Sequence, residues 1–162
     1  MSTSSKFDYP RPNLKNPIHF LAFGGGVGCT PVAPGTAGTL LAVLIFYFLS
    51  LLNFWSYLFI TLCILLLGIF ICQKTSKDMC VEDHPGIVWD EITGFLITMI
   101  GSPREFIWIL IGFLLFRFFD ILKPWPIGLV DKNVKGGAGI MLDDILAGII
   151  SMVILNILLL VF

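Results

Sequence analysis

Five long apolar runs, separated by short polar stretches, make up most of the chain after residue 35. They cover residues 36–52, 54–72, 87–100, 106–122 and 140–162. A helix needs about 20 residues, rising about 1.5 Å each, to cross the roughly 30 Å hydrocarbon layer of a bilayer. The pattern therefore predicts an all-α fold, a polytopic integral membrane helical bundle of about four to five membrane helices. The third run is short, and we expect it to be a partial span continued by its flanks.

Two shorter segments precede these runs. Residues 18–23 form a small amphipathic piece, which predicts a short N-terminal interfacial helix. Residues 1–15 are polar and rich in proline, without an apolar core after a basic start, so we expect no cleaved signal peptide. We therefore expect a polar N-terminal tail over residues 1–15 and a membrane-embedded domain over residues 16–162.

The composition supports a lipid environment. Hydrophobic residues make up 57% of the chain and charged residues only 13%, whereas soluble domains carry about 25% charged residues. The net charge of −1 gives no sign of the basic surface that nucleic-acid-binding proteins present, so no nucleic-acid partner is expected. The four cysteines show no CxxC spacing and are interpreted as small hydrophobic residues with free thiols.

The basic residues predict an orientation, because cytoplasmic loops of membrane proteins carry an excess of Lys and Arg. With the N-terminus in the cytoplasm, all but one of the ten basic residues fall at or just below the cytoplasmic surface. The exception is Arg104, in the tight turn of residues 101–104. The opposite orientation would place almost all of them outside, so we expect a multi-pass protein with a cytoplasmic N-terminus.

Acidic residues of the second half gather on the same predicted face. Two pairs open apolar runs, one residue closes a run and one lies in a loop: Asp90 and Glu91, Asp143 and Asp144, Asp120, and Asp131. Acids at a membrane boundary are costly, and acids of separate helices repel each other if they meet. A bound divalent cation would remove that repulsion, and oxygen ligands without His or Cys favour Mg²⁺. We therefore predict that these six residues bind the metal and that all but Asp131 act in catalysis; the alternative is pairing with nearby lysines in the head-group layer.

Small residues lie one helical turn deeper than the acid pairs. Gly94 follows the first pair, and Ala147 and Gly148 follow the second. Small residues allow membrane helices to approach closely. The third and fifth runs are therefore predicted to cross just beneath the carboxylates.

Candidate phosphate-binding groups accompany the acids. Arg117 and Asp120 are three residues apart on one helix face, which predicts an ion pair. Arg117 and Lys123 are expected to bind a phosphate, although a contact with a lipid head group explains Lys123 equally well. Gly136 and Gly137 belong to a glycine-rich start of the last helix, where backbone N–H groups favour an anion.

Two further residues have two interpretations each. Thr36 could contact a phosphate oxygen or simply cap the first apolar helix. His84 is the histidine nearest the acids, and its ordinary pKa of about 6.5 suits a general acid. A hydrogen bond within its own loop is the alternative for His84.

Four segments together resemble the phosphatidylglycerophosphatase A family: PVAPGTAGTL, KDMCVEDHPGIVWDE, FRFFDILKPWPIGLVD and GGAGIMLDDILAG. The resemblance covers nearly the whole chain from about residue 16 onward and makes residues 16–162 a lipid phosphatase domain. It implies a bacterial inner-membrane enzyme that uses Mg²⁺ to remove the terminal phosphate of phosphatidylglycerophosphate, which yields phosphatidylglycerol. The acidic positions of the family fall on the six acids named above, and its Pro-Gly-Thr, Arg and Lys-Pro positions fall on residues 34–36, Arg117 and residues 123–124.

The predicted mechanism is metal-assisted hydrolysis of a phosphomonoester, with water favoured over an aspartyl nucleophile because no DxDx(T/V) motif is present. Two other functions remain open from the residues. A CDP-alcohol phosphatidyltransferase would require DGxxAR and GxxxDxxxD, which the chain lacks. A small cation carrier would place ionisable residues through the membrane thickness, whereas these acids cluster on one side.

Overall fold

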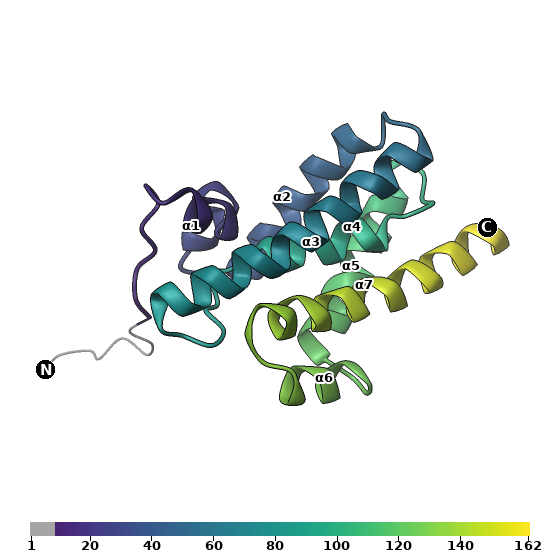
Figure 1. The fold of residues 1–162 in the computed structure, drawn as a ribbon. Coiled ribbons are helices and arrows are strands. Elements are labelled where there is room, and N and C mark those ends of the chain that lie inside the picture. Colours follow the sequence, from purple (N-terminus) through teal and green to yellow (C-terminus); the bar gives the residue numbers. More distant parts are fainter. Residues whose placement is uncertain (1–8) are drawn as a thin grey trace, which may run out of the picture.

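The computed structural model describes residues 9–162, and within them the chain is entirely helical (Figure 1). The elements are α1 (Pro17–Ala22), the 3₁₀ helix η1 (Gly24–Cys29), α2 (Pro34–Leu49), α3 (Phe54–Met79), α4 (Trp89–Thr98), α5 (Phe106–Leu122), α6 (Ile127–Asn133) and α7 (Gly136–Val161). The predicted all-α class and the short N-terminal helix are confirmed. The first eight residues of the predicted polar tail lie outside the described part.

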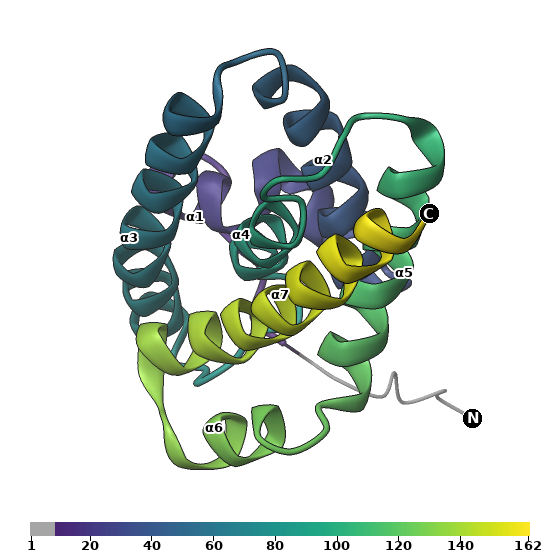
Figure 2. The ribbon, with the colours of Figure 1, turned by 90° about the vertical axis from the view of Figure 1, so that its right-hand side faces the viewer.

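Helix α4 forms the centre of the bundle. It packs against α2, α3, α5 and α7, which surround it in Figure 2. All of its residues from Ile92 to Thr98 are buried. Ten residues span only about 15 Å, and turns rather than helix flank the element on both sides. The prediction that its flanks would extend it toward a full span is therefore wrong, and α4 is a core helix enclosed by protein.

Within residues 9–162, two helices are long and apolar enough to cross a membrane, judged by length and composition. They are α3 and α7, each of 26 residues. Helices α2 and α5 are apolar but have only 16 and 17 residues, or about 24–26 Å. The structure thus supports membrane association through two candidate spans, while the larger number of four to five stays a prediction.

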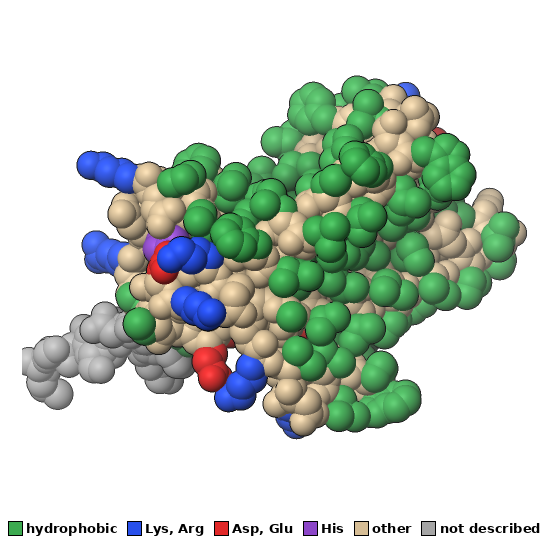
Figure 3. All heavy atoms as spheres, in the orientation of Figure 1, with side chains coloured by type: hydrophobic (Ala, Val, Ile, Leu, Met, Phe, Trp, Pro, Cys, Tyr) green, Lys and Arg blue, Asp and Glu red, His purple; other side chains and the backbone are tan. Residues whose placement is uncertain are grey.

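The surface divides into a charged end and an apolar body. In Figure 3 the Lys and Arg side chains lie mainly around α1 and the C-terminal end of α3, and green hydrophobic side chains cover most of the rest of this face. Large apolar side chains point outward from α3 and α5, including Trp55, Phe59 and Leu114, which are 74%, 66% and 58% exposed. Contiguous exposed apolar surface of this kind marks contact with lipid or another apolar partner.

Helices α4 and α7 cross with almost no space between their backbones. A Cβ added to Gly94 would lie 2.7 Å from the Asp144 carbonyl oxygen, and one added to Gly148 would overlap the Gly94 carbonyl oxygen. The Thr98 hydroxyl donates to the Gly94 carbonyl of its own helix at 3.0 Å and lies 3.5 Å from the Gly148 carbonyl of α7, which links the two helices at the crossing. The predicted close approach beneath the acid pairs is confirmed.

Near the acids, the helices differ in two ways from the sequence-based expectation. Helix α7 begins at Gly136, so Asp143 and Asp144 lie two turns inside it instead of opening it. Asp131 was expected in a loop but lies in α6, a short helix that begins directly after Pro126. The two prolines of residues 124–126 end α5, and the chain then starts the new short helix.

Candidate active site

Three carboxylates from two helices meet at the crossing of α4 and α7. Asp90, Glu91 and Asp144 each offer one oxygen, and these oxygens lie within 4.8 Å of one another. Asp90 and Asp144 are only 9% and 3% exposed. One oxygen of each of the three carboxylates has no hydrogen-bond partner and no exposure to solvent. We call these three residues the carboxylate trio.

Burial without partners makes the trio an expensive arrangement. An unpaired buried carboxylate loses its hydration, and neighbouring carboxylates repel each other at short range. A cation bound by the free oxygens would offset both costs. The donor set is made of hard oxygen atoms with no His or Cys among them, which fits a cation such as Mg²⁺.

Arg117 of α5 lies on one side of the trio. Its Nη1 atom forms an ion pair with Asp120, as the spacing predicted, and lies 3.9 Å from Glu91 Oε1 and 3.5 Å from Thr39 Oγ1. Its Nε atom is buried and has no partner. Gly35 of α2 makes this approach possible, because a Cβ there would overlap Glu91 and lie 3.1 Å from the guanidinium.

Lys123, which ends α5, lies on the other side. Its Nζ atom is 2.6 Å from Asp131 Oδ1 in α6 and 2.6 Å from Asp143 Oδ2 in α7. Burial lowers the pKa of the Lys123 ammonium, but the hydrogen bonds to the two carboxylates outweigh it, and the pKa lies above its ordinary value. Lys123 is therefore a permanent positive charge that ties three helices together.

A polar cavity of about 240 Å³ opens beside this ion pair. Its lining includes Asp83, Asp131, Asp143, Lys132 and Lys135. Desolvation raises the pKa of the Asp83 carboxyl, and the Lys123 charge acts against that rise. Asp83 was not among the predicted site residues. The signal that could have found it is its place seven residues before Asp90 in the same acidic segment.

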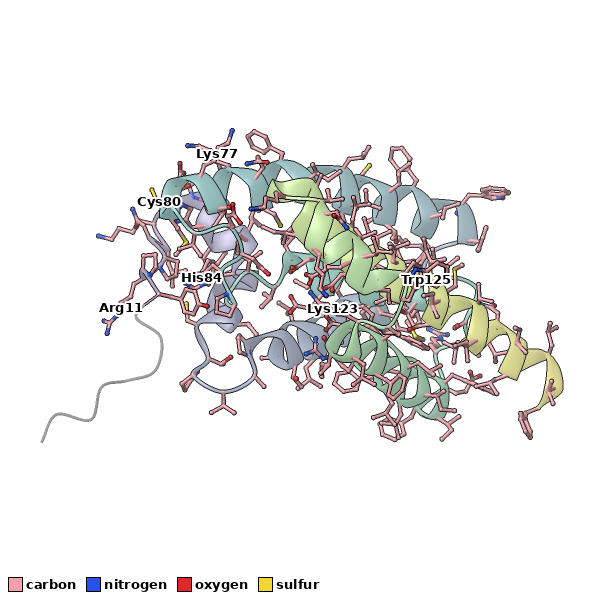
Figure 4. The ribbon with its side chains drawn as sticks, turned by 90° about the horizontal axis from the view of Figure 1, so that it is seen from below. Arg11, Lys77, Cys80, His84, Lys123 and Trp125 are labelled. Atoms are coloured by element: carbon pink, nitrogen blue, oxygen red, sulfur yellow. The ribbon has the colours of Figure 1, made fainter. Side chains whose placement is uncertain are left out.

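His84 is engaged with the backbone and not with the carboxylate trio. Its Nδ1 atom accepts a hydrogen bond from the Gly86 N–H at 3.0 Å, and Nε2 lies 3.1 Å from the Pro10 carbonyl oxygen. Burial lowers the pKa of the ring, which favours the neutral form. In Figure 4, His84 lies toward Arg11 and the N-terminal end, whereas Lys123 lies near the middle of the molecule. The geometry agrees with the loop hydrogen bond and leaves the general-acid role a prediction.

The remaining predicted phosphate-binding residues differ in placement. Thr36 is half-buried in the first turn of α2, and the cap residue of that helix is Ala33, with no side-chain cap, so the capping interpretation is wrong. Gly137 donates its N–H to Gln73 Oε1 at 3.0 Å, which leaves that group unavailable to an anion. Gly136 has φ 76° and lines the polar cavity. Phosphate binding by Thr36 and Gly136 remains a prediction.

Comparison with known proteins identifies the family of the chain. A sequence model of the family described as phosphatidylglycerophosphatase A matches residues 20–159. The chain belongs to the phosphatidylglycerophosphatase A family. It is therefore an enzyme of the phosphatase class.

Individual relatives cover most of the chain. A phosphatidylglycerophosphatase A of Haemophilus influenzae is 48% identical over 147 residues, 88% of each chain. The one of Escherichia coli is 44% identical over 142 residues, covering 87% of this chain and 83% of the relative. A Bacteroides thetaiotaomicron protein named putative phosphatidylinositol-3-phosphatase is 38% identical over 139 residues, 82% of this chain and 87% of the relative. No solved structure gives a significant match. Within the family match lie the carboxylate trio, Arg117 and Lys123.

Proposed function

We propose that the protein is a Mg²⁺-dependent lipid phosphatase that hydrolyses the terminal phosphomonoester of phosphatidylglycerophosphate to give phosphatidylglycerol. Membership in the phosphatidylglycerophosphatase A family and the names of two relatives support the substrate. The observation that carries the chemistry is the carboxylate trio, whose buried oxygens lack partners, with Arg117 on one side and Lys123 on the other.

The trio fits a hard divalent cation in ligand type and in number of free oxygens. Asp90, Glu91 and Asp144 would hold Mg²⁺ between α4 and α7, with water and substrate oxygens as further ligands. When bound, Mg²⁺ would withdraw charge from phosphoryl oxygens and lower the pKa of an attacking water. In contrast to the sequence-based prediction, Asp120, Asp131 and Asp143 do not bind the metal in this proposal. Each of them instead forms an ion pair with a basic side chain and holds it in place.

The basic side chains bind and orient the phosphate. Arg117 presents a planar guanidinium held by Asp120, and such a group donates two parallel hydrogen bonds to phosphate. Lys123 adds a second positive charge from the opposite side. Charges fixed before the reaction stabilise the transition state without further reorganisation.

The reaction then proceeds with water as nucleophile. The water oxygen attacks phosphorus as the bond between phosphorus and the glycerol oxygen breaks, and inorganic phosphate is released. The water gives up one proton to a carboxylate outside the metal-binding trio, such as Asp143, whose Oδ1 atom has no partner, and the glycerol oxygen takes up a proton from solvent to become a hydroxyl. The acyl chains stay in the bilayer while the head group occupies the site.

We place the protein in the bacterial inner membrane, as a multi-pass protein with its site facing the cytoplasm. The relatives are bacterial, and α3 and α7 are long enough to span. Basic side chains gather mainly around α1 and the C-terminal end of α3 in Figure 3, and Arg104 lies apart from them in the turn between α4 and α5, which supports a cytoplasmic position for the basic end.

The other two candidates have less support. Family membership speaks against a CDP-alcohol phosphatidyltransferase. A cation carrier would need acids along its depth, but the buried acids of the described residues, Asp90, Asp143 and Asp144, all belong to α4 and α7 near their crossing. The name of the Bacteroides relative raises a different alternative, a phosphorylated inositol lipid as substrate.

Phosphate release from purified protein in detergent micelles tests the proposal. We expect release from phosphatidylglycerophosphate with Mg²⁺, and none after chelation by EDTA until Mg²⁺ is restored. A parallel assay with phosphatidylinositol 3-phosphate tests the alternative substrate. Absence of release from phosphatidylglycerophosphate in the presence of metal would contradict the proposed substrate, and full activity in EDTA would contradict the metal dependence.

A further inference from the structure

Asp143 and Asp144 are neighbours in sequence with different electrostatic surroundings. Asp144 belongs to the carboxylate trio, and in residues 9–162 no Lys or Arg lies within ion-pair distance of it. Asp143 accepts a hydrogen bond from the Lys123 ammonium. The charge of Asp143 is therefore balanced by a lysine of the chain, whereas the charge of Asp144 would have to be balanced by a cation bound from solution.

The Lys123 ammonium stands where a second divalent cation would otherwise bind. Its Nζ atom lies 2.6 Å from one oxygen of Asp131 and one of Asp143, and carboxylates bind Mg²⁺ at about 2.0–2.1 Å and Ca²⁺ at about 2.3–2.6 Å. Asp83 lines the same cavity. Asp143 is 7% exposed, and its Oδ1 atom is buried without a partner. Without the ammonium, Asp131 and Asp143 would lose their ion-pair partner, and Lys132 and Lys135 would be the lysines left in the lining of the cavity.

The backbone holds Lys123 in this place. Lys123 ends α5 with φ 42°, a left-handed conformation that is uncommon for residues other than glycine. Pro124 follows directly and prevents the helix from continuing. Its two carboxylate partners come from α6 and α7, so three elements fix the ammonium.

We propose that the enzyme binds one divalent cation per chain, at the carboxylate trio, and that Lys123 is the built-in second cation of the site. This inference rests on the proposed metal-dependent function and specifies its metal count. An ammonium has three N–H donors, and two are used by Asp131 and Asp143. The third remains for a phosphoryl oxygen. A single metal ion and one lysine would then together neutralise the phosphate charge that two metal ions neutralise in a two-metal centre.

Mn²⁺ binding to the purified full-length protein, followed by electron paramagnetic resonance, tests the metal count. We expect one tight site per chain in the wild type. Lys123→Met removes the ammonium but keeps the length of the side chain, and should raise the count to two, with spin coupling between the neighbouring ions. Lys123→Arg retains the charge and should keep the count at one.

Lys135→Met is the matched control. Lys135 lines the same cavity and pairs with Glu82 at 3.1 Å, but both side chains are more than 70% exposed. Its loss should leave one ion per chain. Lys123→Gln serves as a second variant if the methionine protein does not fold, with the same gain expected.

The outcomes separate this inference from the function on which it rests. Two tight ions in the wild type would overturn the inference and leave metal dependence intact. No tight ion in the wild type would contradict the metal-dependent function itself. A count of one in folded Lys123→Met or Lys123→Gln protein would show that the lysine does not occupy a cation position.

Discussion

The two ends of the helical bundle differ in whether their buried carboxylates and polar side chains have hydrogen-bond partners. At the end formed by residues 50–53 and 100–105, most polar side chains form local hydrogen bonds, and the buried group left without a partner is the uncharged hydroxyl of Ser102. Asn53 accepts from the Ser56 N–H at 2.9 Å, Ser50 donates to the Tyr47 carbonyl at 2.9 Å, and Asn156 donates to the Ile100 carbonyl at 3.1 Å. At the other end, the trio buries carboxylate oxygens without partners.

This difference indicates that the polar groups of the first end stabilise the fold, and that those of the end with the trio bind a ligand. Capping and loop hydrogen bonds stabilise helix ends by about 1 kcal/mol each. Buried carboxylate oxygens without partners do the opposite, and a bound ion or a catalytic role explains such groups. Substitutions made in matched pairs, one at each end, therefore test the comparison directly.

The largest effect is expected for Asp144→Asn. The amide keeps the shape of the side chain but removes a charged metal ligand, and phosphate release should fall by at least about 100-fold, since even indirect ligand partners are worth 10–100-fold. Glu105→Gln at the opposite end should leave activity unchanged, because Glu105 starts α5 without a side-chain cap. Equal activity of the two variants would remove Asp144 from the site.

A smaller loss of activity is expected for Arg117→Lys. Lysine keeps the charge but cannot donate two parallel hydrogen bonds, so kcat/KM should fall by about 10–100-fold. Arg104→Lys, made in the turn at the other end, should retain the wild-type value. A wild-type kcat/KM for Arg117→Lys would show that the guanidinium does not hold phosphate.

Gly148→Ala tests the crossing that brings the acid pairs together. The added methyl group would overlap the Gly94 carbonyl, and overpacking of this kind costs about 1–3 kcal/mol. We expect a lower melting temperature in detergent, measured by circular dichroism, together with weaker Mn²⁺ binding. Val153→Ala on the exposed side of α7 is the control. An unchanged melting temperature would mean that the helices are farther apart than described.

The smallest effect on activity is expected for His84→Gln. A general acid contributes about 10²–10⁴-fold, whereas a backbone contact that glutamine can partly replace should change kcat by no more than about twofold. A loss of 100-fold or more would restore His84 to the catalytic residues.

His84 also predicts a pH dependence of stability. Burial lowers its pKa in the folded state, so the unfolded chain binds the proton more readily as the pH falls below about 6.5. The stability contributed by neutral His84 is present above that pH and is lost below it. The melting temperature of the wild type should therefore fall more between pH 7 and pH 5.5 than that of His84→Gln; parallel falls would contradict this assignment.

Hydropathy and spacing predicted the features that depend on nearby residues. Apolar runs located the long helices because lipid-facing and core-facing side chains are both apolar, and the small residues at 94 and 148 located the crossing because close approach requires them. The same logic could not tell that α4 is enclosed by protein, since a buried core helix is as apolar as a partial span. The short helix α6 was not predicted, because Pro124 and Pro126 directly before it indicate a turn or loop.

Contacts between distant residues were beyond the reach of the sequence. The link between Lys123 and Asp143 spans 20 positions, and Asp83 joins their cavity from the segment before α4. Only the fold shows that Asp143 faces a lysine while Asp144 faces other acids. The spacing of Arg117 and Asp120 succeeded because three residues on a helix form one face.

The most direct test of the carboxylate trio as a metal site is the anomalous diffraction of Mn²⁺ in crystals of the protein. The account predicts a peak between Asp90, Glu91 and Asp144, at the crossing of α4 and α7. A peak elsewhere, or none at a Mn²⁺ concentration that supports full activity, would contradict it.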